Sequence, residues 1–433
     1  MRPRRLGTYH TCFTVRGRTA AATALILTAL VLCGCGSHGQ SDFASPDPAL
    51  PSLPNTDTGI HLGLAFNHLR SGALAVTRDV DYVFGGGFLD WHVKIDPAVA
   101  HSDFYLPFAD DAYPQSFSGH TLKDWQSQHP SWIVYRCDGQ TPAYDRSGEP
   151  SVPLDFSNPA VQAYGLREAQ AALARGAAGI AVDNFTFTNY EGRCGVHRGG
   201  VWTKLGYPGL FQRNSKYVND MVAWLQAVHS GLRKFYPHAS LAINTNIIAS
   251  GLANLKRAAP YVDVLFDESG FTSYGTQNLT GVAWQQEVDA LEYLNRVERA
   301  FVVNGIVDAP SDPAVTPDQI NWVLGNYLLV KGGHSYTYIY ARGDSGTGSS
   351  PNGYGTFYDR PQYHVPIGHP IAKREQRDGL QLRRYSGGLA IVNPSPSQSH
   401  TMRLDATYRD MFGRTYNSVT LPPARAVVLL AVR

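Results

Sequence analysis

Short apolar runs recur between residues 60 and 340, and several of the intervals between them have a helical pattern. The runs comprise residues 62–66, 82–86, 132–136, 179–184, 241–246, 262–268, 301–306 and 335–340. Continuous apolar strands that alternate with helices are typical of a parallel sheet covered on both faces. Eight of them predict a (β/α)8 barrel. A doubly wound sheet is the alternative, and the lack of a GxGxxG motif after the first run weighs against it.

Three of the expected helices carry their own start and stop signals. One begins at Asn158, a capping residue followed by proline, and runs to Gly176. A second starts near Ser215 and places its apolar residues on one face. The third opens with the capping box of Thr316 and ends at a glycine pair, residues 332–333.

The pattern changes after the eighth run. Apolar runs of alternating type, separated by turn residues and without a helix, follow from about Gly379. We therefore expect a barrel domain over residues 59–360 and a small antiparallel β-sandwich over residues 361–433.

The N-terminal segment has the composition of a bacterial export signal. Residues 1–34 contain five arginines and no acidic residue, and an apolar stretch over residues 19–32 is too short to span a bilayer comfortably. The following Leu-Cys-Gly-Cys sequence resembles a lipobox, which implies lipidation of Cys35. An ordinary signal peptide is the alternative. Residues 35–58 are rich in Ser, Pro and Asp and read as a flexible tether, so we expect a lipid-anchored protein on the extracytoplasmic side of the envelope.

Composition and charge narrow the class of protein. The chain has 433 residues, of which 43% are hydrophobic and 17% charged, so disordered, collagen-like and coiled-coil classes are excluded. Its net charge is +2, and the five leader arginines account for the whole basic surplus. A nucleic-acid partner is therefore not expected.

Five cysteines are present, and two of them remain in the expected folded domain. Cys137 and Cys194 form an even pair in an oxidising compartment, which predicts a disulfide between two loops at the carboxyl end of neighbouring strands. No CxxC, HExxH, P-loop or GxSxG motif occurs, so no metal or cofactor is predicted.

Candidate chemistry lies where the predicted strands end, because the reacting groups of barrel enzymes come from those ends. Carboxylates follow two strands, as Asp183 with Asn184 and as Asp267 with Glu268. Such a pair suits the acid–base hydrolysis of a glycosidic bond. Other strand ends offer hydrogen-bonding groups for sugar hydroxyls, namely Arg136, Asn244, Asn246, Asn304, Tyr340 and Arg342. Faces for stacking on sugars are expected from Trp91, Trp132, Trp202 and Trp284.

Three stretches resemble a group of bacterial hypothetical glycosyl hydrolases of the TIM-barrel type. They are LDFSNPAVQAYGLREAQAALARGAAGIAVDNF, YVDVLFDESGF and the C-terminal region from GGLAIVNP to AVVLL. The resemblance implies that Asp183 is the nucleophile or base and that Glu268, rather than its neighbour Asp267, is the acid/base. It also implies that Asp155 and Asn184 bind or orient a polysaccharide or oligosaccharide. Two other classes stay open, a barrel that binds envelope glycan without cleaving it and a structural lipoprotein of a larger complex.

Overall fold

The computed structural model describes residues 52–65, 80–86, 101–112, 119–144, 151–344 and 357–432. All of them belong to one compact unit, Asp47–Arg433. The expected signal, Cys35 and most of the expected tether lie outside the described residues. No helix within these ranges is long and apolar enough to cross a membrane.

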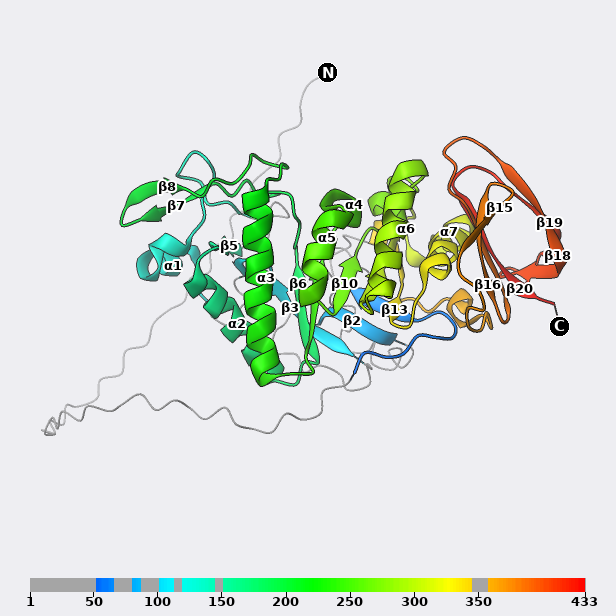
Figure 1. Ribbon diagram of the computed structural model, residues 1–433, viewed down its shortest axis with the longest axis horizontal. Coiled ribbons are helices and arrows are strands. Elements are labelled where there is room, and N and C mark those ends of the chain that lie inside the picture. Colours follow the sequence, from blue (N-terminus) through cyan, green and yellow to red (C-terminus); the bar gives the residue numbers. More distant parts are fainter. Residues whose placement is uncertain are drawn as a thin grey trace, which may run out of the picture. The chain divides into compact units, whose positions relative to one another are not determined.

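Eight parallel strands form the barrel that the sequence predicts (Figure 1). Going around the barrel, they are β1 (Leu62–Ala65), β2 (Val80–Gly86), β3 (Ser102–Pro107), β6 (Gly179–Asp183), β9 (Ser240–Asn244), β10 (Val264–Asp267), β11 (Ala300–Val303) and β13 (Ser335–Tyr336). A parallel bridge between Leu62 and Thr337 joins the last strand to the first. Two short strands, β12 (Gly305–Val307) and β14 (Ile339–Ala341), pair in parallel beyond β11 and β13.

The third barrel strand differs from the prediction. Residues 132–136 make only isolated bridges, at Ile133 and Tyr135, and the third strand is β3. Its Asp103 is fully buried and accepts hydrogen bonds from the Tyr82 hydroxyl at 2.7 Å and the Ser240 hydroxyl at 2.5 Å. These partners belong to β2 and β9, and the His101 ring, two residues before Asp103, lies 2.9 Å from the same carboxylate. A polar residue that argues against a buried strand is thus satisfied largely by residues distant in the sequence.

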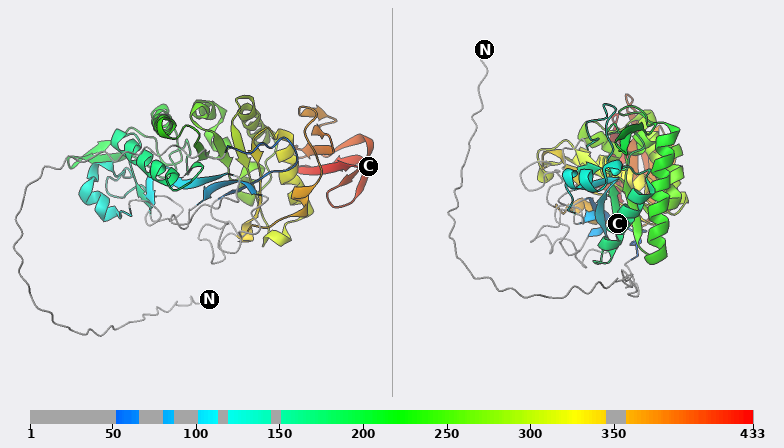
Figure 2. Two further views of the ribbon diagram at one scale, coloured as in Figure 1. Left: turned by 90° about the horizontal axis from the view of Figure 1, so that it is seen from below. Right: turned by 90° about the vertical axis from the view of Figure 1, so that its left-hand side faces the viewer.

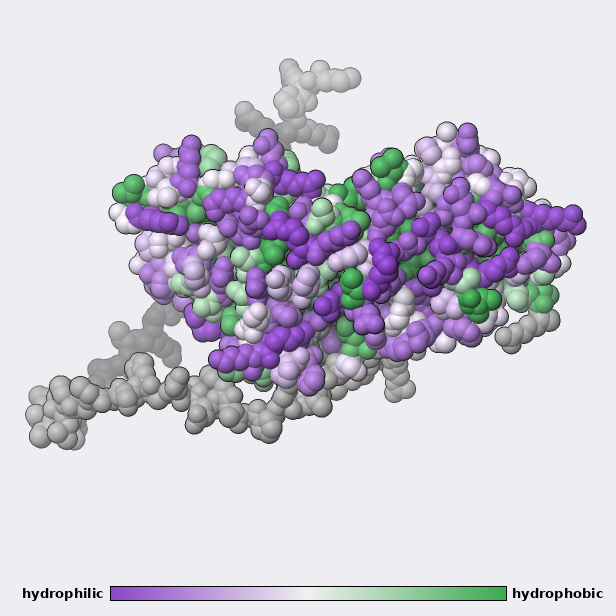
Figure 3. All heavy atoms as spheres, in the orientation of Figure 1, coloured by the Kyte–Doolittle hydropathy of each residue, from purple (hydrophilic) through white to green (hydrophobic). Residues whose placement is uncertain are grey.

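Five described helices cover the outside of the barrel, namely α2 (Pro159–Leu173), α3 (Ser215–Phe235), α5 (Leu252–Ala258), α6 (Gly281–Arg296) and α7 (Pro317–Val330). Two short ones do not: α1 (Leu122–Gln128) packs in a separate cluster after β3, and α4 (Ile247–Ser250) follows directly after β9. The three predicted helices are α2, α3 and α7, and the Asn158 cap and the Thr316 capping box are both present. The face shown in Figure 3, over α3 and α6, is largely hydrophilic, as expected of amphipathic helices with one buried side.

The predicted C-terminal antiparallel domain is confirmed. Six strands are hydrogen bonded in the order β15 (Glu375–Arg377), β16 (Leu380–Tyr385), β17 (Gly388–Asn393), β20 (Arg425–Ala431), β18 (His400–Asp410) and β19 (Thr415–Leu421). The sheet lies against α7 (Figure 2), where a Cβ on Gly325 would come within 2.9 Å of the Ala426 side chain. Glycine therefore lets the helix and the sheet approach closely.

Excursions of the chain follow β3 and β6. They contain two short antiparallel pairs, β4 (Asp110–Ala112) with β5 (Ser151–Pro153) and the hairpin of β7 (Gly195–Arg198) with β8 (Val201–Lys204). The predicted disulfide between Cys137 and Cys194 joins the two excursions. Next to it, the buried Arg193 guanidinium donates to Glu191, to Asp110 at 3.2 Å and to the Leu154 carbonyl at 3.2 Å. The two loops above these neighbouring strands are thus fixed to each other.

Candidate active site

Two carboxylates meet at the carboxyl end of the barrel. Asp183 is the last residue of β6, and Glu268 comes directly after β10. Asn244 ends β9, the strand between them, and its Nδ2 donates to Asp183 Oδ1 at 2.7 Å and to Glu268 Oε2 at 3.1 Å. One amide nitrogen therefore holds both carboxylates, and the strand order places it between them.

Asp183 is fixed from a second side. The Tyr105 hydroxyl, from β3, donates to Asp183 Oδ2 at 3.3 Å. The next residue, Asn184, has a left-handed backbone with a φ of 57°. That turn sends the buried Phe185 into contact with Phe108 and Trp224, with ring centroids 4.8 and 6.3 Å away. Packing of the loop onto the outer core thus sets where β6 ends and where the Asp183 carboxylate points.

Glu268 is half-buried, and its surroundings favour the protonated form. Burial raises the pKa of Glu268 to about 8, with the negative charge of Asp183 as the second cause and that of Asp267 as a further one. The hydrogen bond from Asn244 acts in the opposite direction. Glu268 is therefore largely a carboxylic acid at neutral pH.

Asp267 has a different environment. Its oxygens accept hydrogen bonds from the backbone N–H groups of Ile247 at 2.8 Å, Ser269 at 2.9 Å and Gly270 at 2.9 Å, and from the Ser269 hydroxyl at 2.9 Å. It is buried and holds the loop after β10 against the start of α4. Asp267 is thus engaged by its own loop and by α4, and the assignment of the acid to Glu268 stays a prediction.

The other residues expected to bind substrate at strand ends are placed as follows. Asn246 caps α4 and donates to the Ser269 hydroxyl at 3.2 Å. The Tyr340 hydroxyl accepts from the Ala65 backbone at 2.6 Å, and Glu268 is one of the groups that raise the Tyr340 pKa, after burial. Asn304 is buried, and its side-chain amide has no hydrogen-bond partner within the described residues. Arg342 is exposed just after β14.

Asp155 and Arg136 lie in the excursion after β3, because residues 132–136 are not a barrel strand. Asp155 is buried and accepts from the Ser157 backbone at 3.1 Å and the Ser157 hydroxyl at 2.6 Å, in the turn before α2. Arg136 donates its backbone N–H to Thr141 at 2.8 Å, beside the disulfide. These contacts shape loops, and substrate binding by either residue stays a prediction.

The aromatic residues exposed on these loops are not those expected from the sequence. Trp284 is buried in α6, where its N–H donates to Asn326 at 2.6 Å, and Trp132 stacks on His129. Trp202 packs over Gly139, and Trp91 lies outside the described residues. Tyr190 and Phe211, after β6, and Tyr274, after β10, are exposed instead. The sequence signal that could have identified these three residues is their position in polar, glycine-containing loops that follow the carboxylate-bearing strands.

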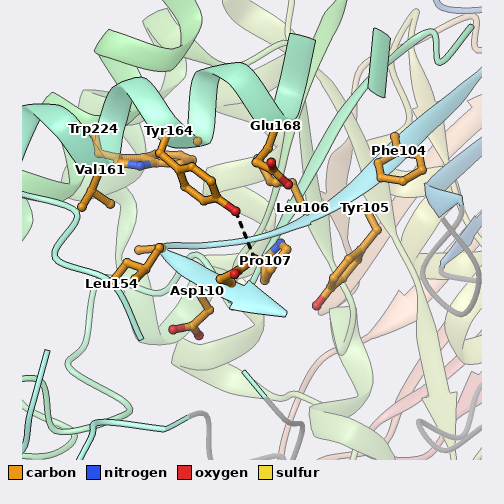
Figure 4. Close-up of a pocket in the computed structure, with 13 residues that line it drawn as sticks. Phe104, Tyr105, Leu106, Pro107, Asp110, Leu154, Val161, Tyr164, Glu168 and Trp224 are labelled. Atoms are coloured by element: carbon orange, nitrogen blue, oxygen red, sulfur yellow. Dashed lines mark hydrogen bonds between the residues drawn. The ribbon is translucent and has the colours of Figure 1, made fainter. Parts of the chain in front are cut away.

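A small cavity lies behind the site, between β3 and α2 (Figure 4). Its volume is about 30 Å³, and its lining includes Leu154, Val161 and Trp224. Tyr164 donates to Asp111 there at 3.1 Å, while Tyr105 extends away from α2. This volume holds one or two water molecules and is too small for a sugar ring. Among the described residues, no group of three His, Cys, Asp or Glu side chains is arranged to hold a metal ion.

Comparison with known proteins gives similarities in structure only. No protein-family model matches the chain, and no curated protein sequence does. Similar solved structures include the glycoside hydrolase domain of PelA from Pseudomonas aeruginosa, with 12% identity, 66% of this chain and 96% of that chain covered, and a TM-score of 0.41. An alpha-amylase from Lactobacillus plantarum has 11% identity, with 86% and 99% covered and a TM-score of 0.45. The alpha-glucosyl transfer enzyme XgtA has 11% identity, the same coverage and a TM-score of 0.46.

Proposed function

We propose that this protein is a retaining glycoside hydrolase that acts on a polysaccharide or oligosaccharide. The observation that carries the proposal is the sharing of the Asn244 nitrogen by Asp183 and Glu268. Two oxygens at 2.7 and 3.1 Å from one nitrogen are at most about 5.8 Å apart. Retaining enzymes hold their carboxyl groups roughly 5–5.5 Å apart, whereas inverting enzymes need about 6.5–9.5 Å to admit a water molecule.

In the first step Asp183 is the nucleophile and Glu268 the acid. An Asp183 oxygen forms a bond to the anomeric carbon while the bond from that carbon to the leaving oxygen breaks. The Glu268 proton goes to the leaving oxygen. Hydrogen bonds from Asn244 and Tyr105 stabilise the negative charge that Asp183 needs for this attack.

In the second step Glu268 is the base. Once Asp183 is esterified its charge is gone, and one of the causes that raise the Glu268 pKa disappears with it. Glu268 then takes a proton from water, whose oxygen bonds to the anomeric carbon as the Asp183 ester breaks. The shared site thus lowers the proton affinity of Glu268 at the step that requires a base.

We also propose that the enzyme works outside the bacterial cytoplasm, attached to the envelope by a lipid on Cys35. The disulfide between Cys137 and Cys194 supports an oxidising compartment. Metabolic labelling with an alkyne fatty acid tests the anchor, since Cys35→Ala is then expected to lose the label.

The test of the reaction is to trap the intermediate. Full-length protein is incubated with 2-deoxy-2-fluoroglycosyl fluorides of the common hexoses, and peptides are examined by mass spectrometry. A glycosyl adduct on Asp183 is the expected result, and Asp183→Asn is the control that has none. Binding of glycans without any adduct or cleavage would instead favour a binding module.

A further inference from the structure

Four apolar side chains are exposed together on the loops of the candidate active site. Tyr190, Leu210, Phe211 and Tyr274 form this rim patch, and they are 39%, 42%, 55% and 45% exposed. Large apolar side chains gain free energy when they are removed from water, so a cluster of them on a surface indicates a binding site.

The rim patch lies on the loops of the two strands that carry the carboxylates. Tyr190 and Phe211 belong to the excursion after β6, and their rings are 5.5 Å apart at an angle of 66°. Tyr274 belongs to the loop after β10. It is part of the turn Gly270–Gly275, which begins two residues after Glu268. The three rings therefore all lie on the loops that follow the two carboxylates.

A buried asparagine fixes the first loop. Asn189 donates its side-chain amide to the carbonyls of Arg193 at 2.8 Å and Pro208 at 2.7 Å. Its backbone exchanges hydrogen bonds with the segment of Phe211 and Gln212 at 2.9 and 2.7 Å. The exposed rings of Tyr190 and Phe211 are thus held on a rigid support, which a surface for stacking requires.

The backbone beneath two of the rings is in an unfavourable conformation. Phe211 has a φ of 58° and Tyr274 a φ of 54°, next to Ser273 with a φ of 44°. Side-chain-bearing residues rarely adopt this left-handed region, and such positions cluster at ligand-binding sites. Two of the exposed aromatic rings are therefore carried by backbone positions of unfavourable conformation.

We propose that the rim patch is a platform on which successive sugar units of a glycan stack beside Asp183 and Glu268. This rests on the proposed function and deepens it, because a platform outside the carboxylate pair selects an oligomer or polymer over a disaccharide. The apolar C–H faces of pyranose rings fit aromatic faces, and the tyrosine hydroxyls offer hydrogen bonds to sugar hydroxyls. The negative charge of Asp183 at the same rim disfavours acidic sugars, so the platform selects a glycan without acidic groups.

Binding is measured in an Asp183→Asn background, so that the glycan stays intact. Affinity electrophoresis is run in gels containing starch, pullulan, dextran, laminarin or mannan, with alginate as the acidic comparison. We expect the Asp183→Asn parent to be retarded by a neutral polymer and not by alginate. Phe211→Ala and Tyr274→Ala should each weaken binding roughly 10-fold.

Phe235→Ala is the matched control. Phe235 is 51% exposed at the C-terminal end of α3, on the opposite end of that helix from the β6 loop. The Phe235→Ala variant should bind glycan as tightly as the Asp183→Asn parent does. Where an alanine variant melts early, Phe211→Leu and Tyr274→Leu replace it, because leucine keeps apolar volume without a stacking face.

Three results would overturn the platform. The first is that no neutral polymer retards the parent, and the second is that the rim-patch variants bind as tightly as the parent. The third is a concentration-dependent dimer of wild-type protein that Phe211→Ala abolishes in light scattering, which would show a self-association surface.

The proposed function can fail independently of the platform. Binding that depends on the patch, with glycan left intact by wild-type protein, would sustain the platform and refute hydrolysis. Cleavage of glycan by wild-type protein, with an unchanged KM in Phe211→Ala, would sustain hydrolysis and refute the platform.

Discussion

Asp267 and Glu268 are neighbours in the sequence, but their carboxylates face different surroundings. Asp267 accepts three hydrogen bonds from its own loop and a fourth from the backbone of Ile247 at the start of α4. Glu268 faces Asp183 and shares the Asn244 amide with it. Adjacent residues at the end of a strand point to opposite sides, so one carboxylate faces its own loop and the other faces Asp183.

Loss of either shared carboxylate should abolish turnover. We expect Asp183→Asn and Glu268→Gln each to lower kcat by at least about 1,000-fold, because nucleophilic attack or protonation of the leaving group is lost. Measurements with a cleaved glycan and thermal melts check this. Azide is expected to restore activity to Glu268→Gln on substrates with a good leaving group.

Asp289→Asn serves as the control for this pair, since Asp289 is an exposed acidic residue on α6 that pairs with Gln285. It should retain wild-type activity. Full activity in the Asp183→Asn, Glu268→Gln double variant would refute the assigned roles.

Activity should fall on the alkaline side as Glu268 loses its proton. With a Glu268 pKa of about 8, kcat/KM is expected to decline above about pH 8. Asn244→Ala removes the hydrogen bond that lowers this pKa, so its alkaline limb should move to higher pH while activity also drops. If the alkaline decline of kcat/KM occurs at the same pH in Asn244→Ala as in wild type, the titrating group is not Glu268.

The carboxyl group of Glu268 should lower the stability of the folded protein at alkaline pH. Its folded-state pKa is raised from 4.5 to about 8, so the unfolded chain releases the proton first and stability falls as pH rises through that interval. Glu268→Gln is therefore expected to unfold at a higher temperature than wild type at pH 8, with little difference at pH 4.5. Differential scanning calorimetry at the two pH values measures this, and an equal shift at both would indicate a packing effect.

Asp267 should matter for stability rather than for chemistry. Asp267→Ala leaves three backbone donors and a hydroxyl without their acceptor, and we expect a loss of about 2–4 kcal/mol in the free energy of unfolding. Urea unfolding followed by circular dichroism tests the size of the loss. Asp267→Asn, which keeps an acceptor oxygen, should lose less, and a variant as stable as wild type would contradict the role in the loop.

Glu287 on α6 offers a stabilising change. It is fully buried, neither carboxyl oxygen has a hydrogen-bond partner within the described residues, and burial followed by the charge of Asp267 raises its pKa. Glu287→Gln or Glu287→Leu should stabilise the fold by about 1–3 kcal/mol at pH 7. The reason is that folding of the wild type at this pH must protonate a carboxylate that is ionised in the unfolded chain, and neither replacement has this cost. The gain should shrink toward pH 4.5, where the unfolded side chain is protonated too. Chemical denaturation at both pH values checks the trend.

The sequence by itself determined the architecture of this protein. The eight-strand barrel, the capped helices α2 and α7, the antiparallel C-terminal domain and the pair Cys137 and Cys194 all follow from local patterns of apolar, capping and cysteine residues. The strand ends also brought Asp183 and Glu268 forward as candidates, because parallel strands present their carboxyl ends at one rim.

Only the tertiary structure decided the rest. The third strand carries Asp103, and two of its partners, Tyr82 and Ser240, lie on β2 and β9, so the sequence of the segment does not reveal that Asp103 is buried. The apolar run at residues 132–136 packs in a separate cluster with Trp125, Val152 and Val161 and therefore imitates a barrel strand. The Asn244 bridge, the raised pKa of Glu268 and the rim patch likewise depend on distances between strands and loops. The periodicity of apolar residues indicates which face of a helix or strand is buried. Which other element packs against that face is decided only when the barrel closes.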